Sequence, residues 1–182
     1  EQILTLAFND KAAAEIQERL DIALDLGYTE MGIFTFHAFC QRLLEEHGLD
    51  IGISSAFKVL DQSETWLLMR EHLPDFGLRY YRPLGNPYKH IHELIRHFSK
   101  CKDELISPEE YLHYAEGLQL NTDKVLEEDY NRLTELANAY HHYNQLLLDK
   151  GVLDFGDLLR HSVRLLSERE RVRSLIQKRY HY

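Results

Sequence analysis

Two short apolar runs near the start of the chain are each followed directly by a helical pattern. Residues 3–8 have the continuous apolar pattern of a buried strand, and apolar side chains at helical spacing then predict a helix over residues 11–26, which Gly27 ends. A second short strand is predicted over residues 31–34, followed by a helix over residues 37–47. The pattern therefore predicts a small α/β unit whose strands run straight into helices.

Helical periodicity dominates the rest of the chain. Helices are predicted over residues 62–73, 88–102, from 108 onward, 126–150, 154–166 and 168–178. A loop rich in Gly and Pro separates the helices over residues 62–73 and 88–102. Ser107 is expected to cap the helix that follows, with Pro108 as its first residue. We expect the last two to pack against the first 50 residues, because a sheet needs a covering layer.

Composition is that of a folded protein. The 182 residues are 44% hydrophobic, which is enough for one core or two small ones. No apolar run approaches the roughly 20 residues that span a bilayer, and no basic region followed by an apolar signal core opens the chain, so we expect a cytoplasmic location. Cys40 and Cys101 lack C-x-x-C spacing, so both are expected to be reduced packing residues.

Charge is unevenly distributed. The chain carries 30 acidic residues against 21 Lys and Arg, a net charge of -9 that repels nucleic acid on average. Between residues 79 and 102, however, Glu93 is the only acid beside six cations, with Tyr and Phe interleaved. Such a mixture is typical of protein surfaces that bind nucleic acid. It also fits an ordinary solvated helix whose tyrosines pack against the base of that helix. The cations are Arg79, Arg82, Lys89, Arg96, Lys100 and Lys102.

Other chemistry finds little support in the sequence. Of the eleven histidines, His97 shares a helix face with Cys101, but His90 and His92 point apart on a helix. We therefore expect no metal site, and no local spacing supports a hydrolytic triad or any other catalytic residue. Asp154 and Asp157 are three residues apart, as in a helix cap, and are not expected to hold magnesium.

Five segments together resemble a known family. LAFNDKAAAEIQERL at residues 6–20 resembles motif Ia, and TFHAFCQRLL at residues 35–44 resembles motif Ib, of superfamily 1 DNA helicases of the UvrD, Rep and PcrA type. Residues 57–61 and 98–110 are similar to the helical 1B insertion of that family. Residues 151–159 are similar to the segment that returns to its first RecA-like domain.

The resemblance implies a mainly α fold with a small α/β part. A helical 1B-type subdomain, residues 50–153, would be inserted into a truncated RecA-like domain, 1A, made of residues 1–49 and 154–182 with a small parallel-sheet remnant. The sequence has no G-x-x-x-x-G-K-[ST] loop for ATP phosphates and no DExx box. We therefore expect an inactive fragment that holds no cofactor, whereas its intact parent would bind ATP and Mg²⁺ and unwind DNA.

The resemblance also implies DNA contacts at the two strand-to-helix turns. Phe8 would contact a base or sugar of single-stranded DNA, with a core ring as the alternative. Asn9 and Asp10 replace the usual Thr-Asn of motif Ia, whereas Lys11 matches the family. Thr35 and His37 would donate to a phosphate oxygen, with an N-cap and a satisfied turn histidine as the alternatives. For Phe36, a core ring is the more typical role of its residue type. The full set of predicted DNA contacts is Phe8, Asn9, Lys11, Thr35, Phe36, His37, Tyr88, Lys89, Arg96, Lys100 and Lys102.

The expected partners are single-stranded DNA, a duplex junction and the rest of the helicase chain, and not a membrane. Weakly shielded strands could also allow a dimer. Two alternatives stay open: a non-enzymatic helical module for protein contact, and the helicase arm of a recombination nuclease.

Overall fold

The computed structural model describes residues 3–24, 32–117 and 124–182. The chain divides into two compact units: unit 1 comprises Glu1–Phe57 and Leu158–Tyr182, and unit 2 comprises Lys58–Asp157. Helices dominate both units, and the strands form two small parallel pairs. The prediction of a mainly α fold with a small parallel-sheet remnant is therefore confirmed.

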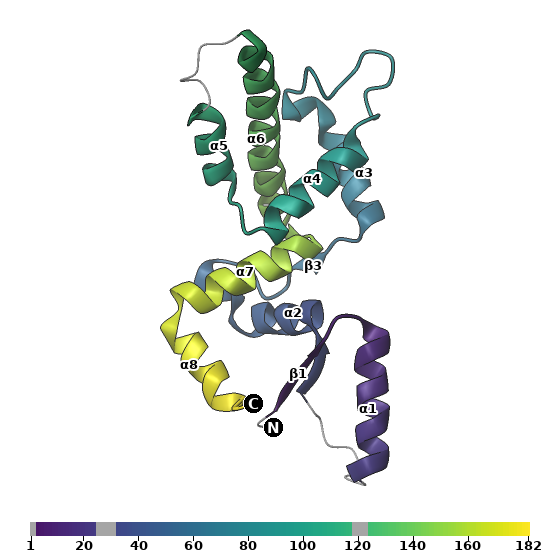
Figure 1. Ribbon diagram of the computed structural model, residues 1–182, viewed down its shortest axis with the longest axis vertical. Coiled ribbons are helices and arrows are strands. Elements are labelled where there is room, and N and C mark those ends of the chain that lie inside the picture. Colours follow the sequence, from purple (N-terminus) through teal and green to yellow (C-terminus); the bar gives the residue numbers. More distant parts are fainter. Residues whose placement is uncertain (1–2, 25–31, 118–123) are drawn as a thin grey trace. The chain divides into compact units, whose positions relative to one another are not determined.

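Unit 1 is built on two neighbouring strand-helix pairs (Figure 1). Its elements are β1 (Leu4–Ala7), α1 (Asp10–Leu24), β2 (Gly32–Thr35), α2 (Phe36–His47), the 3-10 turn η1 (Gly48–Ile51), most of α7 (Phe155–Glu168) and α8 (Glu170–Arg179). Each predicted strand and helix is present, with bounds shifted by a few residues. Gly27, the expected end of the first helix, and Met31, the expected start of the second strand, lie outside the described residues.

The C-terminal segment packs against the first 50 residues, as expected. The Ser162 hydroxyl donates to the Cys40 carbonyl at 3.3 Å, and the Tyr180 ring meets Phe39 edge-on at 6.2 Å. Close approach explains one glycine here, because a Cβ on Gly32 would lie 2.7 Å from the Ile3 carbonyl oxygen. Segments far apart in sequence thus pack against each other in unit 1.

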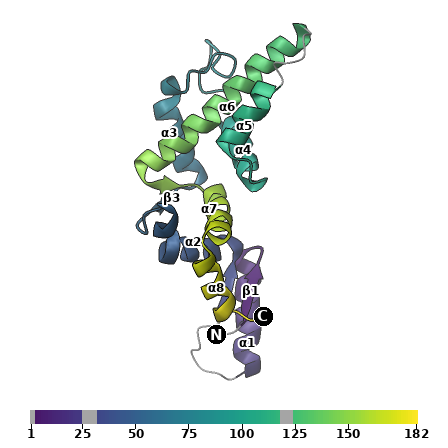
Figure 2. The same cartoon turned by 90° about the vertical axis from the view of Figure 1, so that its left-hand side faces the viewer.

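Unit 2 is a cluster of helices closed by a small parallel bridge. Figure 1 and Figure 2 both show α5 alongside α6. The elements are β3 (Lys58–Val59), α3 (Gln62–His72), η2 (Leu73–Phe76), α4 (Ile91–Asp103), α5 (Pro108–Gly117), α6 (Lys124–Lys150) and β4 (Val152–Leu153). The bridge between β3 and β4 was missed, because two-residue strands carry no periodic pattern.

An aromatic stack forms the centre of unit 2. Phe98 is fully buried, and its ring stacks on Tyr140 at 5.4 Å and on Tyr143 at 5.2 Å. The Tyr140 hydroxyl donates to the Ile106 carbonyl at 3.0 Å, which satisfies that phenol inside the core. This stack therefore ties α4 to the middle of α6.

Side-chain caps define several helix starts in unit 2. Ser107 accepts from the Glu110 amide at 3.1 Å, and the Glu110 carboxylate accepts from the Ser107 amide at 2.8 Å, which confirms the predicted cap of α5. Asp61 and Glu64 form the same reciprocal pair at α3. No helix in the described part of the chain is both long and apolar enough to cross a membrane.

Candidate nucleic-acid interface

The two strand-to-helix turns of unit 1 lie at one edge of the sheet. β1 and β2 pair in parallel with Ala7 opposite Thr35, so Phe8 and Phe36 follow from neighbouring strand ends. Phe8 is 91% exposed and Phe36 is 47% exposed. A ring that the fold leaves this open contributes little to a core, so the alternative that Phe8 is a core ring is wrong. We name residues 8–11 and 35–37 the strand-end turns.

Asn9 stabilises the first turn, although this residue departs from the family pattern. Its side-chain oxygen accepts from the Ala12 amide at 2.8 Å, which caps α1. The amide nitrogen of the Asn9 side chain is still a donor, because only the oxygen serves the cap. Lys11 is exposed in the first turn of the same helix, where a bound anion would offset its unfavourable position near the positive helix end.

Thr35 performs the capping role that its sequence position suggested. Its hydroxyl oxygen accepts from the Ala38 amide at 3.2 Å, and the residue is 9% exposed. Capping uses one lone pair of this oxygen and leaves the O–H as a donor. The cap and a phosphate contact are thus compatible at this position. His37, in the first turn of α2, is half-buried.

The basic stretch divides between surface and core. Tyr88, Lys89, Arg96 and Lys100 are exposed, as a contact surface requires. The prediction for Lys102 is wrong, because this side chain is fully buried and unavailable to DNA. The physical reason is its place on α4, four residues after Phe98 on the face that packs into the core.

Lys102 instead forms ion pairs with two carboxylates. Its ammonium lies 2.7 Å from an oxygen of Asp154 and 2.9 Å from an oxygen of Asp157, and 4.8 Å from the centre of the Tyr143 ring. Gly156 makes room for the lysine stem, since a Cβ there would lie 3.0 Å from it. The Asp157 amide also donates to Asp154 at 2.9 Å, which confirms the predicted cap.

This cluster ties stability to acid pH. Burial by itself would raise the pKa of Asp154, but the Lys102 charge and hydrogen bonds from Lys102, Tyr143 and the Asp157 amide hold that pKa below its ordinary value of 3.8. A carboxyl with a depressed folded-state pKa stabilises above its unfolded pKa, and this contribution is lost as pH falls through the folded value. We therefore expect the urea concentration at the unfolding midpoint of unit 2 to decrease as the pH falls below about 4. This decrease should be less steep in Asp154→Asn.

The acid prediction is measured by the fluorescence of Trp66, the single tryptophan of the chain, which lies in unit 2. Asp75→Asn is the matched control, because Asp75 is exposed and interacts with His72 at the surface. Equal acid sensitivity of the Asp154 and Asp75 variants would contradict the prediction.

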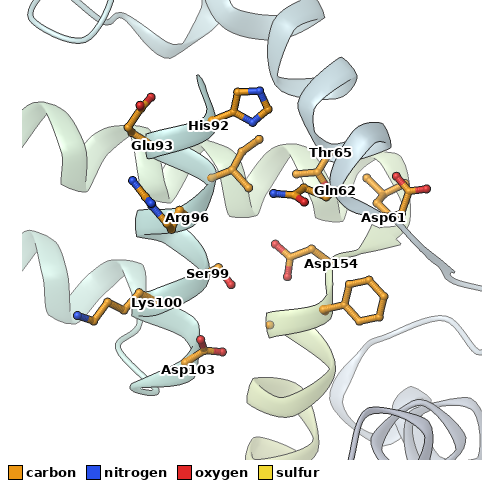
Figure 3. A pocket seen from close by; sticks show the side chains of 14 residues that line it. Asp61, Gln62, Thr65, His92, Glu93, Arg96, Ser99, Lys100, Asp103 and Asp154 are labelled. Atoms are coloured by element: carbon orange, nitrogen blue, oxygen red, sulfur yellow. The ribbon is translucent and has the colours of Figure 1, made fainter. Parts of the chain in front are cut away.

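A groove opens in unit 2 between α3, α4 and the start of α7, with a volume of about 680 Å³. Figure 3 shows Gln62 and Thr65 on one side and Ser99 on the other, with Asp154 between them. Phe155 also lines it and is 52% exposed. No role was predicted for this ring from the sequence, although its place directly after the capping residue Asp154 was an available signal.

The histidine cluster of α4 is held by packing contacts. His97 shares a hydrogen bond of 2.9 Å with the Tyr111 hydroxyl and lies 3.8 Å from the Cys101 sulfur. Burial lowers the pKa of His97, as does the nearby charge of Lys100. Across residues 3–24, 32–117 and 124–182, no group of three or more His, Cys, Asp or Glu side chains could hold a metal ion.

Comparison with known proteins gives one consistent family. The family model of the UvrD/REP helicase N-terminal domain matches residues 1–182. The chain is 28% identical over 180 residues to the ATP-dependent DNA helicase PcrA of Bacillus subtilis, which covers 99% of this chain and 22% of that protein. It is 28% identical to UvrD1 of Mycobacterium tuberculosis, over 100% of this chain and 22% of UvrD1.

A eukaryotic relative is also similar. The ATP-dependent DNA helicase SRS2 of Saccharomyces cerevisiae is 31% identical over 195 residues, which covers 96% of this chain and 15% of SRS2. The chain thus spans about a quarter or less of the length of these curated relatives.

Proposed function

The chain belongs to the UvrD/REP helicase N-terminal domain family, and from this premise we propose that it is the part of an ATP-dependent DNA helicase that holds single-stranded DNA. Unit 1 would be part of the first RecA-like domain, 1A, and unit 2 the helical 1B subdomain. The observation that carries the proposal is the pair of exposed rings, Phe8 and Phe36, at paired strand ends.

The strand-end turns would bind single-stranded DNA by two kinds of contact. Flat exposed rings stack on bases of any sequence, which suits a protein that moves along DNA. Beside the rings, Asn9, Lys11 and His37 offer donors at the first turns of two helices, where the positive helix ends also favour phosphate. Thr35 would add its hydroxyl proton.

Unit 2 would contact the duplex ahead of the strand or guide the strand. It supplies one exposed ring, Tyr88, and three exposed cations, Lys89, Arg96 and Lys100, on a chain that is acidic elsewhere. Positive charge in one place and net negative charge overall would concentrate DNA on this part of the unit. A duplex junction and the rest of the helicase chain are the partners that this role implies, and a dimer through the strand pair stays a prediction.

Asp154 and Asp157 do not fit a magnesium ion. These two largely buried carboxylates already share the Lys102 ammonium, so they do not offer a magnesium site. The sequence also has no glycine-rich phosphate loop. In the proposed function, nucleotide hydrolysis belongs to other segments of the helicase.

Removing the ring of Phe8 should weaken single-strand binding by about 5- to 150-fold, because one base-stacking contact is lost. Phe8→Ala and the Phe8→Ala, Phe36→Ala double variant would be measured by fluorescence anisotropy with a labelled single-stranded oligonucleotide at several salt concentrations. The slope of log affinity against log salt should stay unchanged, since neither ring carries a charge.

Ile22→Ala is the matched control, as Ile22 is an apolar side chain of unit 1 that is 78% exposed on α1. Unchanged binding in the double variant would remove the proposal. Absence of binding at low salt would do the same, and would favour a helical module for protein contact.

A further inference from the structure

A second pocket of unit 2 lies between α4, α6 and the loop that follows η2. Its volume is about 550 Å³, and its lining includes Tyr81, His90, Glu93, Arg96, Lys100 and Leu136. Pockets of this size hold small molecules or single nucleotides. We name it the Tyr81 pocket.

One wall of the Tyr81 pocket carries positive charge. Arg96 and Lys100 are four residues apart on one face of α4, and Figure 3 shows both projecting from the side of that helix opposite to Ser99. Within the described residues neither forms an ion pair, although exposed cations pair at several other positions, such as Arg132 with Glu128. An anion would therefore find two available cations in this pocket.

The lining also includes an aromatic ring held in place. Tyr81 is half-buried and meets the His90 ring in a T-shaped contact at 6.1 Å. Burial raises the pKa of the Tyr81 hydroxyl, as does the charge of Glu135 against an opposing effect of Arg132, so the phenol stays neutral. A neutral ring beside two cations suits a ligand with both a flat apolar part and a negative charge.

Glu135, on α6, fixes the backbone that carries this ring. Its carboxylate accepts from three consecutive amides, those of Arg79 at 3.0 Å, Tyr80 at 3.2 Å and Tyr81 at 3.1 Å. Arg132, one turn earlier on the same helix, lies over the Tyr80 ring at 5.6 Å. Hydrogen bonds to a charged acceptor are the stronger kind, so the loop is positioned before any ligand arrives.

We propose that the Tyr81 pocket binds one nucleotide of a DNA strand, with its phosphate between Arg96 and Lys100 and its base against Tyr81. Glu93 distinguishes this ligand from a simple anion, because a carboxylate repels phosphate yet accepts hydrogen bonds from a base amino group. The inference rests on the proposed function for its choice of ligand, and it assigns Glu135 as a positioning residue.

Calorimetry with deoxyadenosine monophosphate, deoxyadenosine and inorganic phosphate tests the proposal. The monophosphate should bind at least tenfold more tightly than either of its parts. Arg96→Gln should weaken its binding at least tenfold and Tyr81→Leu by about 5- to 150-fold. Arg70→Gln, which removes an exposed cation of α3 that does not line the pocket, should have no effect. Equal binding of the monophosphate and inorganic phosphate, or no loss in Arg96→Gln, would overturn it.

Glu135→Gln separates positioning from general damage. The variant should lose most of the preference for the monophosphate over inorganic phosphate, while inorganic phosphate still binds through Arg96 and Lys100. Glu127→Gln makes the same charge change at an exposed position of α6 and should keep the preference. A preference that survives in Glu135→Gln would remove the positioning role.

The outcome is independent of the strand-end turns, because those lie in unit 1 and the Tyr81 pocket lies in unit 2. If Phe8→Ala weakens oligonucleotide binding while the monophosphate does not bind, only the pocket assignment is wrong. If the monophosphate binds as described while oligonucleotide binding ignores Phe8 and Phe36, the proposed function of unit 1 is wrong and the pocket stands.

Discussion

Replacing Lys102 by methionine is expected to lower the free energy of unfolding of unit 2 by about 3–5 kcal/mol. The substitution keeps an unbranched stem of similar length and removes the charge that Asp154 and Asp157 share. Both carboxylates would stay largely shielded from water but would lose their counter-charge. A buried charge without a partner is costly. Urea unfolding followed by Trp66 fluorescence measures the change.

Lys100→Met is the matched control for stability, because Lys100 is exposed two residues earlier on α4. That variant should stay within about 0.5 kcal/mol of the starting protein. A triple variant, Lys102→Met with Asp154→Asn and Asp157→Asn, should regain part of the loss, since no unpaired charge remains buried. Equal effects of the Lys102 and Lys100 substitutions would contradict this account of the cluster.

Phe98→Ala should lower the free energy of unfolding of unit 2 by about 3–5 kcal/mol as well, through a cavity in the core. Phe98 is fully buried and stacks on Tyr140 and Tyr143, so its removal takes away apolar burial and two ring contacts at once. The same urea titration measures the change, and the emission of Trp66 again reports on this unit.

Tyr114→Ala is the control for the loss of a ring, because Tyr114 is 62% exposed on α5. Its effect should stay within about 0.5 kcal/mol. Phe98→Leu should cost less than Phe98→Ala, because the larger side chain leaves a smaller cavity. A loss in Phe98→Ala no greater than that in Tyr114→Ala would show that the stack does not hold α4 on α6.

Local sequence signals were sufficient wherever the determining contacts are close in the chain. The cap pair Ser107 and Glu110, and the cap pair Asp154 and Asp157, each lie three residues apart, so spacing alone predicts them. The strands of unit 1 and the helices that follow them were also visible in the apolar pattern.

The candidate site was harder to predict, because charge and exposure are not the same property. Lys102 belongs to a basic stretch by sequence and to the core by structure, since its partners Asp154 and Asp157 come some fifty residues later. Its spacing of four residues from Phe98 was the signal that could have revealed this. Conversely, Phe8 is of a residue type that is usually buried, but the chain turns at the strand end and leaves its ring exposed.

The sequence by itself determined the helical character, the family motifs and the local caps of this protein, because these depend on residue types at short and regular spacing. Only the tertiary structure decided which cations stay at the surface, that Phe8 and Phe36 lie at neighbouring strand ends, and that Glu135 holds the loop of Tyr81. Each of these depends on contacts between residues far apart in the chain, and such contacts form only when burial of apolar surface brings the elements together.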